Sequence, residues 1–299
     1  MSLPSLASNR RGIAAMSLAM ASFVANDALV KYISESLPSA QLIFVRGLFA
    51  TALLGIAAHA LGATRQLSTV FQRKVVGRSV LDGLATLTYL TSLFHLPIAN
   101  ATAINMATPL FITLFAVLAL GERVGLARWL AIVTGFAGVL LVVQPSAAGF
   151  NAYALLCLGG TLLHASRDLL TRYIHANVPS ILITLATAVT VTLLSGGLSL
   201  VQGWQPMTAR HLALLALASV FLSIGYYLII VGMRHGDMSV VAPFRYTGLL
   251  FALAIGWAAW GDTPNALAFT GIALLVGAGL YVLHNERTRG RDALEAAPD

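Results

Sequence analysis

The fold is decided by a stretch of sequence that occurs twice, beginning at residue 26 and again at residue 167. The first copy reads Asn26-Asp27-Ala28-Leu29-Val30-Lys31-Tyr32-Ile33, and the second reads Arg167-Asp168-Leu169-Leu170-Thr171-Arg172-Tyr173-Ile174. Leu37-Pro38-Ser39 follows the first copy, and Val178-Pro179-Ser180 follows the second. Asp, Tyr, Ile, Pro and Ser coincide, and Lys31 corresponds to Arg172. Identical residues in the same order at one shift indicate an internal repeat.

The repeat extends beyond this stretch. At nearly the same shift, Gly121-Glu122 corresponds to Gly261-Asp262, and His95 corresponds to His235. Each copy therefore covers close to half of the chain.

The composition is that of a membrane protein, with 58% hydrophobic and only 10% charged residues. A soluble fold of this length cannot hide so much apolar surface. Apolar segments of about the length that a spanning helix needs occur ten times. We predict spans at Gly12–Ile33, Ser39–Leu61, Val75–His95, Pro97–Leu120, Leu126–Val143, Phe150–Ile174, Pro179–Val201, His211–Met233, Ser239–Trp260 and Asn265–Leu283. Short connections lead us to expect antiparallel packing of consecutive helices.

These spans predict an all-α membrane protein whose ten transmembrane helices form two five-helix repeats, residues 12–143 and 150–283. Because five is odd, the second repeat enters the membrane from the opposite side, which makes the repeats inverted. Inverted repeats are typical of transporters that work by alternating access around a midplane site. Residues 1–11 form a cytoplasmic N-terminus in this prediction. Residues 285–299 form a polar cytoplasmic tail that we expect to be disordered from Asn285 onward.

Positive charges give the orientation, because cytoplasmic loops are enriched in Lys and Arg. If the N-terminus is cytoplasmic, the outer side holds only Lys31 and Arg210. The cytoplasmic side then holds Arg10, Arg11, Arg65, Arg73, Lys74, Arg78, Arg123, Arg128, Arg172, Arg234, Arg287, Arg289 and Arg291. Both termini are therefore predicted to be cytoplasmic. The net charge of +7 follows from this distribution along helix ends and does not predict nucleic-acid binding.

The repeat pattern resembles the drug/metabolite transporter superfamily. Leu120-Gly121-Glu122-Arg123 is similar to the Leu-Gly-Glu signature of its EamA-type branch, and Asn26, Lys31, Pro38 and Arg46 match the first-repeat pattern of that branch. Within the branch, the chain resembles YddG-type amino-acid exporters. The resemblance implies efflux of small metabolites across the bacterial inner membrane. The first span lacks the glutamate of the small multidrug-resistance relatives, which argues against antiport of lipophilic cations.

Charged residues inside predicted spans are functional candidates, because each costs roughly 2.5–3.5 kcal/mol on insertion scales. Six residues qualify: Asp27, Arg46, Asp82, Arg167, Asp168 and Arg245. Helix rise places the first two toward the outer ends of their spans and the other four toward the cytoplasmic ends. We therefore expect two ionic layers, acting as alternating gates, on either side of an apolar centre. Salt bridges that only pack helices together are the alternative interpretation.

Other polar and aromatic residues inside spans are candidates for the substrate cavity: Tyr89, Asn105, His164 and Tyr246. Pro109 and Pro243 lie inside spans, where a proline removes a backbone hydrogen bond, and are candidate hinges. The single cysteine, Cys157, lies in an apolar segment and is interpreted as a packing residue.

The most specific function that the sequence favours is secondary export of neutral and aromatic amino acids. Efflux of drugs or other metabolites by the same fold is the alternative. A membrane-embedded enzyme is disfavoured, because the seven histidines are scattered and no His-Glu-x-x-His motif occurs. No metal site and no cofactor are expected. The expected partners are the small-molecule substrate and the lipid bilayer, and a monomer is compatible with the sequence.

Overall fold

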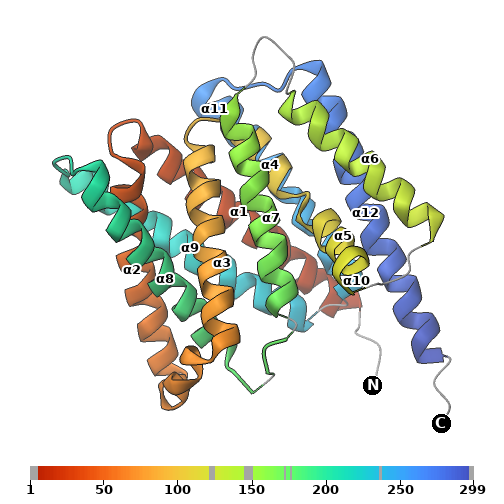
Figure 1. Ribbon diagram of the computed structural model, residues 1–299, viewed down its shortest axis with the longest axis horizontal. Coiled ribbons are helices and arrows are strands. Elements are labelled where there is room, and N and C mark those ends of the chain that lie inside the picture. The colour runs from red at the N-terminus through yellow and green to blue at the C-terminus, as the bar shows by residue number, and fades with distance from the viewer. Residues whose placement is uncertain are drawn as a thin grey trace.

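The computed structural model describes residues 6–120, 125–144, 151–171, 173–175, 177–235 and 238–295. Within these ranges the chain forms helices joined by loops (Figure 1). The first half contains α1 (Leu6–Ser34), α2 (Ser39–Ala60), the 3₁₀ helix η1 (Ala63–Phe71), α3 (Arg73–Leu93), α4 (Ile98–Asn105), α5 (Thr108–Leu120) and α6 (Leu126–Val143). The second half contains α7 (Ala152–Thr171), α8 (Ser180–Gln202), α9 (Ala209–His235), α10 (Met238–Val241), η2 (Ala242–Tyr246), α11 (Thr247–Trp260) and α12 (Ala266–Glu295).

Apolar composition makes these helices membrane spans. Five helical stretches of the described chain are long and apolar enough to cross a bilayer: Asn9–Ser34, Ser39–Ala60, Ile98–Phe115, Ser180–Gln202 and Ala209–Ile229. Trp129–Val143 and Ala266–Val282 are shorter apolar helices. The remaining predicted spans also coincide with helix, and two of them, α3 and α7, carry charged side chains within the helix. The all-α membrane fold is confirmed.

Prolines and glycines set several helix ends. Pro38 and Pro179 directly precede α2 and α8, where a fixed φ and a missing N–H do no harm to the helix. Gly261 ends α11 with φ 69°, in the left-handed region that glycine enters without steric cost.

The fourth span of each repeat is broken. In the first repeat, Met106 and Ala107 separate α4 from α5, just before Pro109. In the second repeat, the 3₁₀ helix η2, which contains Pro243, separates α10 from α11. The two prolines are not at equivalent repeat positions, yet both fourth spans are interrupted at about the same depth.

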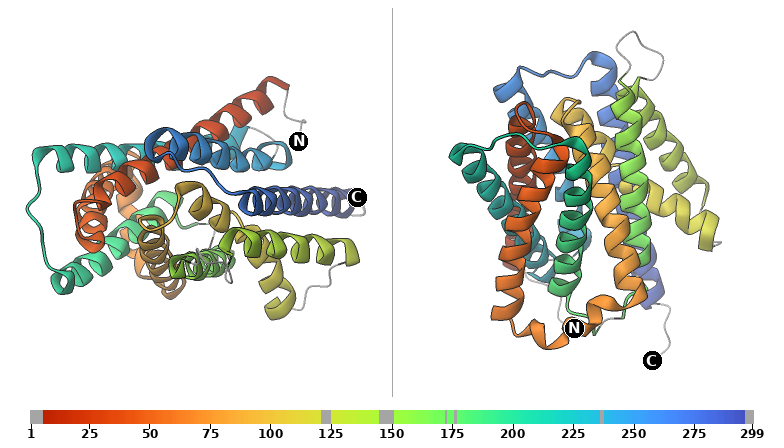
Figure 2. Two further views of the ribbon diagram at one scale, coloured as in Figure 1. Left: turned by 90° about the horizontal axis from the view of Figure 1, so that it is seen from above. Right: turned by 60° about the vertical axis from the view of Figure 1, so that its left-hand side comes forward.

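The repeats are interleaved. Four pairs of helices share the most extensive contacts, and two of them, α1–α9 and α3–α7, exchange under the repeat symmetry (Figure 2, right, shows α3 beside α7). The pairs α2–α8 and α6–α12 map onto themselves. The expectation that consecutive helices are the main neighbours is wrong, because α1 and α2 touch little, as do α2 and α3. Each helix of these pairs therefore finds its principal partner in the other repeat.

The α6–α12 pair is in backbone contact (Figure 1). A Cβ atom added to Gly138 would lie 2.6 Å from the carbonyl oxygen of Gly271. Glycine at both positions lets the helices approach this closely, as is common between transmembrane helices.

The C-terminal tail differs from the expectation, and part of the repeat pattern lies outside the described residues. The expected disorder from Asn285 is wrong as far as Glu295, because α12 continues to that residue. The Gly121-Glu122 motif lies outside the described residues, as does Arg172, and His235 ends α9.

Candidate functional site

A polar cluster joins α1, α2 and α3 toward their predicted outer ends, and we call Asn26, Asp27, Arg46 and Tyr89 the outer cluster. The Asp27 carboxylate accepts hydrogen bonds from the Tyr89 hydroxyl (2.9 Å) and from the Asn26 amide (2.9 Å). The Asn26 amide oxygen accepts a bond from Arg46 Nη1 (3.2 Å). All four side chains come from the first repeat, and Ser219 of α9 adds a bond to the Arg46 carbonyl oxygen (3.0 Å).

Asp27 and Arg46, which form the predicted outer ionic layer, do not make a direct ion pair in this structure. The Asn26 amide lies between them and bonds to both. Arg46 is only 5% exposed, and its Nε atom is buried without a hydrogen-bond partner. The guanidinium group is thus held in place by a neutral neighbour.

A second cluster surrounds Asp82 of α3, and we call Arg78, Asp82, Arg167 and Asp168 the inner cluster. Asp82 pairs with Arg78 one turn earlier (3.2 Å) and with Arg167 of α7 (2.8 Å). Arg167 also contacts Asp168 (2.8 Å). Arg78 donates to Thr187 of α8 (2.6 Å) and to Thr171 (3.2 Å). The inner cluster therefore links the two repeats.

The region between the clusters is polar and aromatic, so the expected apolar centre is wrong. His164 Nδ1 lies 2.9 Å from the Asn105 amide oxygen, and Nε2 lies 4.0 Å from Asp82 Oδ1. The His164 ring is 6.2 Å from the Tyr89 ring, centroid to centroid. Three of the predicted cavity residues, Tyr89, Asn105 and His164, are thus brought together at the junction of α3, α4 and α7.

Tyr226 of α9 completes this region. Its hydroxyl lies close enough to Asp82, Arg167, Arg78 and Arg46 for the charges of both clusters to act on it. Its ring packs edge-on against Phe23 of α1, with centroids 5.2 Å apart. Tyr226 is 37% exposed, although it lies beside these buried charges.

The remaining predicted residues lie elsewhere. Arg245, in η2, is exposed. It interacts electrostatically with Asp168, but the two do not form an ion pair. The Tyr246 hydroxyl is buried against Gly279 of α12 and has no hydrogen-bond partner. The structure therefore does not bring Tyr246 together with Tyr89, Asn105 and His164.

Sequence reasoning missed three residues of the site. Arg78 was counted as a cytoplasmic loop charge, although its spacing of four from Asp82 is the signal for a helical ion pair. Asn26 was used only as a family marker. Tyr226 shares a helix face with Ser219 and Ser223, but the sequence does not show what that face meets.

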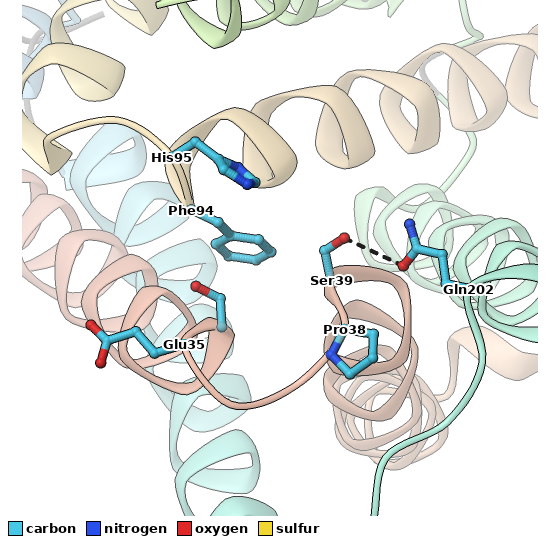
Figure 3. A pocket seen from close by; sticks show the side chains of 7 residues that line it. Glu35, Pro38, Ser39, Phe94, His95 and Gln202 are labelled. Atoms are coloured by element: carbon cyan, nitrogen blue, oxygen red, sulfur yellow. Dashed lines mark hydrogen bonds between the residues drawn. The ribbon is translucent and has the colours of Figure 1, made fainter.

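The predicted outer end of the bundle carries a pocket of about 410 Å³. Its lining comes from Ser34, Glu35, Pro38, Ser39, Phe94, His95 and Gln202. Figure 3 shows Ser39 and Gln202 side by side, with the Ser39 hydroxyl donating to the Gln202 amide oxygen (3.5 Å). Between this pocket and Asp27 along α1 lies Lys31.

Lys31 of α1 contacts the outer ends of α3 and α11. Its ammonium group donates to the carbonyl oxygens of Leu93 (2.9 Å), the last residue of α3, and Leu96 (2.6 Å), in the loop after it. It also lies 5.6 Å from the Trp260 ring centroid at the end of α11. Trp260 in turn donates to Glu35 (3.1 Å). We call this arrangement the Lys31 clamp.

The described residues contain no group of three His, Cys, Asp or Glu side chains that could hold a metal ion. Cys157 is fully buried, and its thiol faces the Ala101 carbonyl oxygen at 3.7 Å. Its placement agrees with the packing role expected from the sequence.

Comparison with known proteins places the chain in a family. The model of the EamA-like transporter family matches twice, over residues 10–144 and 151–283. A solved crystal structure superposes with a TM-score of 0.60 at 22% identity and covers 92% of this chain and 95% of that chain. That likeness supports the fold.

Several curated relatives are transporters. A riboflavin transporter of Rhizobium johnstonii is 34% identical over 72% of this chain and 71% of its own length. The pseudopaline exporter CntI of Pseudomonas aeruginosa is 28% identical over 89% and 94%, respectively. An S-adenosylmethionine uptake transporter of Rickettsia bellii is 25% identical over 92% and 94%. The chain belongs to the EamA-like transporter family, within the drug/metabolite transporter superfamily, and is a small-metabolite transporter rather than an enzyme.

Proposed function

We propose that this EamA-like transporter exports small metabolites carrying an amino-acid group, above all neutral and aromatic amino acids. The observation that carries the proposal is the aromatic region between the two charged clusters. Two ring pairs from four helices border it: Tyr89 with His164, and Tyr226 with Phe23, where Tyr226 is within range of the charges of both clusters. An aromatic side chain would pack against these rings, while the amino-acid group would face the opposite charges of Asp27 and Arg46.

Alternating access is the proposed mechanism. The interleaved pairs of helices give the bundle two nearly equivalent halves, which can exchange conformations around a central site. The broken fourth spans, at Pro109 and Pro243, would supply the hinges. Neither half needs a bound nucleotide for this exchange.

The charged residues are proposed to act as gates. Asp82, Arg167 and Asp168 of the inner cluster, with Arg245 nearby, would close the cytoplasmic side in one state and become hydrated in the other. Asp27 and Arg46 would close the outer side. The cross-repeat pair between Asp82 and Arg167 supports this proposal, because a relative movement of the repeats must strain or break it.

We further propose that the protein resides in the bacterial inner membrane with both termini in the cytoplasm. The excess of Lys and Arg on one side supports this orientation. η1, the start of α1 and the end of α12 lie toward the same side of the bundle (Figures 1 and 2).

A second candidate substrate class is larger metabolites such as flavins. The 34% identity to a riboflavin transporter favours it. The relatives named above include both an exporter and an uptake transporter, so import is the alternative to export.

Transport by purified protein in liposomes tests the proposal. The panel contains phenylalanine, leucine, riboflavin, S-adenosylmethionine and a lipophilic cation, each with and without an imposed pH gradient. We expect flux of phenylalanine and leucine above that of empty liposomes. Flux of riboflavin or the cation alone would replace the amino-acid proposal with the second class or with drug efflux. Export in cells would appear as tolerance of toxic amino-acid analogues.

A further inference from the structure

Arg46 carries a permanent positive charge in a buried position. Its guanidinium has five N–H donors and stays ionised in proteins. A buried charge is costly unless it is paired and hydrogen-bonded. Within the part of the chain that the structure describes, the side chain makes one bond, from Nη1 to the Asn26 amide oxygen, and Nε has no partner.

The neighbouring carboxylate does not supply the missing partner. Both oxygens of Asp27 are engaged, one by the Tyr89 hydroxyl and the other by the Asn26 amide. Asn26 separates the two charges by accepting from Arg46 and donating to Asp27. The outer cluster thus presents a cation and an anion that are fixed next to each other but not paired.

Access to Arg46 comes from the side of Tyr226. The Tyr226 hydroxyl is within range of the Arg46 charge, and more than a third of the Tyr226 side chain is exposed. Asp27 is itself only partly buried. A ligand that reaches Tyr226 from the central region therefore comes next to the guanidinium.

We propose that Arg46 is the anion-binding residue of the substrate site and takes a carboxylate of the transported molecule, with the Tyr226 hydroxyl as a second donor. This inference rests on the proposed function in its choice of substrate and deepens it by assigning the carboxylate to one residue. A guanidinium matches a carboxylate with two parallel N–H···O bonds, which lysine cannot reproduce. The bond to Asn26 positions the guanidinium before the ligand arrives.

Three small probes separate the charges of an amino acid. 3-Phenylpropionate has the carboxylate without the ammonium group, phenylalaninamide has the ammonium group without the carboxylate, and phenylalanine has both. Binding is measured on full-length purified protein as a ligand-dependent rise in melting temperature, titrated to give an apparent Kd. The variants are Arg46→Gln, Arg46→Lys and Tyr226→Phe, with Arg65→Gln as the control, because Arg65 is exposed in η1.

We expect 3-phenylpropionate and phenylalanine to bind the wild type and the Arg65→Gln control equally. Arg46→Gln should raise the apparent Kd for 3-phenylpropionate about tenfold or more, the size of effect seen when a buried charge pair loses one partner. Arg46→Lys should also raise the apparent Kd for 3-phenylpropionate, but by a smaller factor. Tyr226→Phe should raise it a few-fold. Phenylalaninamide should bind all variants with Kd values within about twofold of the wild type.

An unchanged Kd for 3-phenylpropionate in Arg46→Gln, or no binding of either carboxylate to the wild type, would overturn the inference. If Arg46→Gln does not fold, the Kd of 3-phenylpropionate in Arg46→Lys and Tyr226→Phe tests the inference instead. The first variant keeps the positive charge and the second keeps the aromatic ring. If 3-phenylpropionate binds through Arg46 but liposomes pass no amino acid, the anion site stands and only the amino-acid proposal fails.

Discussion

Asp82 of α3 accepts a hydrogen bond of 2.8 Å from Arg167 of α7, so a buried carboxylate of one repeat is held by a guanidinium of the other. Arg78 approaches the same carboxylate from one helical turn away. Two cations thus share this buried anion, whereas the more exposed Asp168 pairs with Arg167. This makes Asp82 the residue of the inner cluster whose loss has the largest consequence.

We expect Asp82→Asn to lower the free energy of unfolding by about 3 kcal/mol, because removing one partner of a buried pair leaves the remaining charges uncompensated. Transport should fall as well if the cluster is a gate. Melting in detergent and liposome flux measure the two effects. The exposed Arg65→Gln serves as the control for loss of a charge. An Asp82→Asn protein that melts and transports like the wild type would contradict the assignment of Asp82.

Neighbouring glycines of α7 make a matched pair of variants. A Cβ atom at Gly160 would lie 2.9 Å from Thr88 Oγ1 and 3.2 Å from the Tyr89 backbone nitrogen, whereas Gly159 has nothing within 4 Å. We expect Gly160→Ala to destabilise by about 1–3 kcal/mol through overpacking and to disturb Tyr89. Gly159→Ala should be neutral or slightly stabilising, because alanine favours the helix. Equal melting temperatures for the two variants would show that α3 and α7 are not packed as described.

The Lys31 clamp should control access from the predicted outer end. Lys31→Met removes the donor from the carbonyl oxygens of Leu93 and Leu96 at the end of α3, and such groups need a partner when they are buried. In a Cys157→Ala background, a cysteine at the fully buried Val30 should react several-fold faster with an impermeant thiol reagent when Lys31 is replaced. Lys74→Met, an exposed lysine at the start of α3, should leave the rate unchanged. Equal labelling rates in the Lys31→Met and Lys74→Met variants would show that the Lys31 clamp does not control access.

Orientation can be measured in the same background. A cysteine at Gln205, in the exposed loop between α8 and α9, should be labelled by the impermeant reagent from outside intact cells. A cysteine at Gln72, beside η1, should react only after the cells are opened. Labelling at Gln72 from outside would reverse the predicted topology.

The sequence predicted some helices well because local signals define them. The predicted span Leu126–Val143 coincides with α6, a mainly apolar run that begins after Gly125 and ends before Gln144-Pro145. The breaks in the fourth spans were only partly foreseen. Pro109 and Pro243 indicated irregular helix, but the chain leaves α4 at Met106 and Ala107, before the proline. Pro109 has no N–H to donate to the carbonyl oxygen of Asn105, four residues earlier. The Thr108 hydroxyl bonds to that oxygen instead (2.6 Å).

The sequence predicted which residues of the site lie together only where their depth along the helices was enough to group them. Helix rise grouped Asp82, Arg167 and Asp168, and the structure brings them into contact. Depth does not give rotation or neighbours, however. For this reason the sequence did not show that Asn26 would separate Asp27 from Arg46, or that Tyr246 would turn toward α12.

The interleaving of the repeats has a consequence for how the chain is made. Helices leave the ribosome in order, so α1 enters the membrane long before its partner α9 exists. The four side chains of the outer cluster all belong to α1, α2 and α3, and their bonds can form as soon as the third helix is inserted. Asp82 must wait for Arg167 but has Arg78 on its own helix. The polar network is thereby arranged so that nascent helices need not hold isolated charges in lipid while the second half is still being translated.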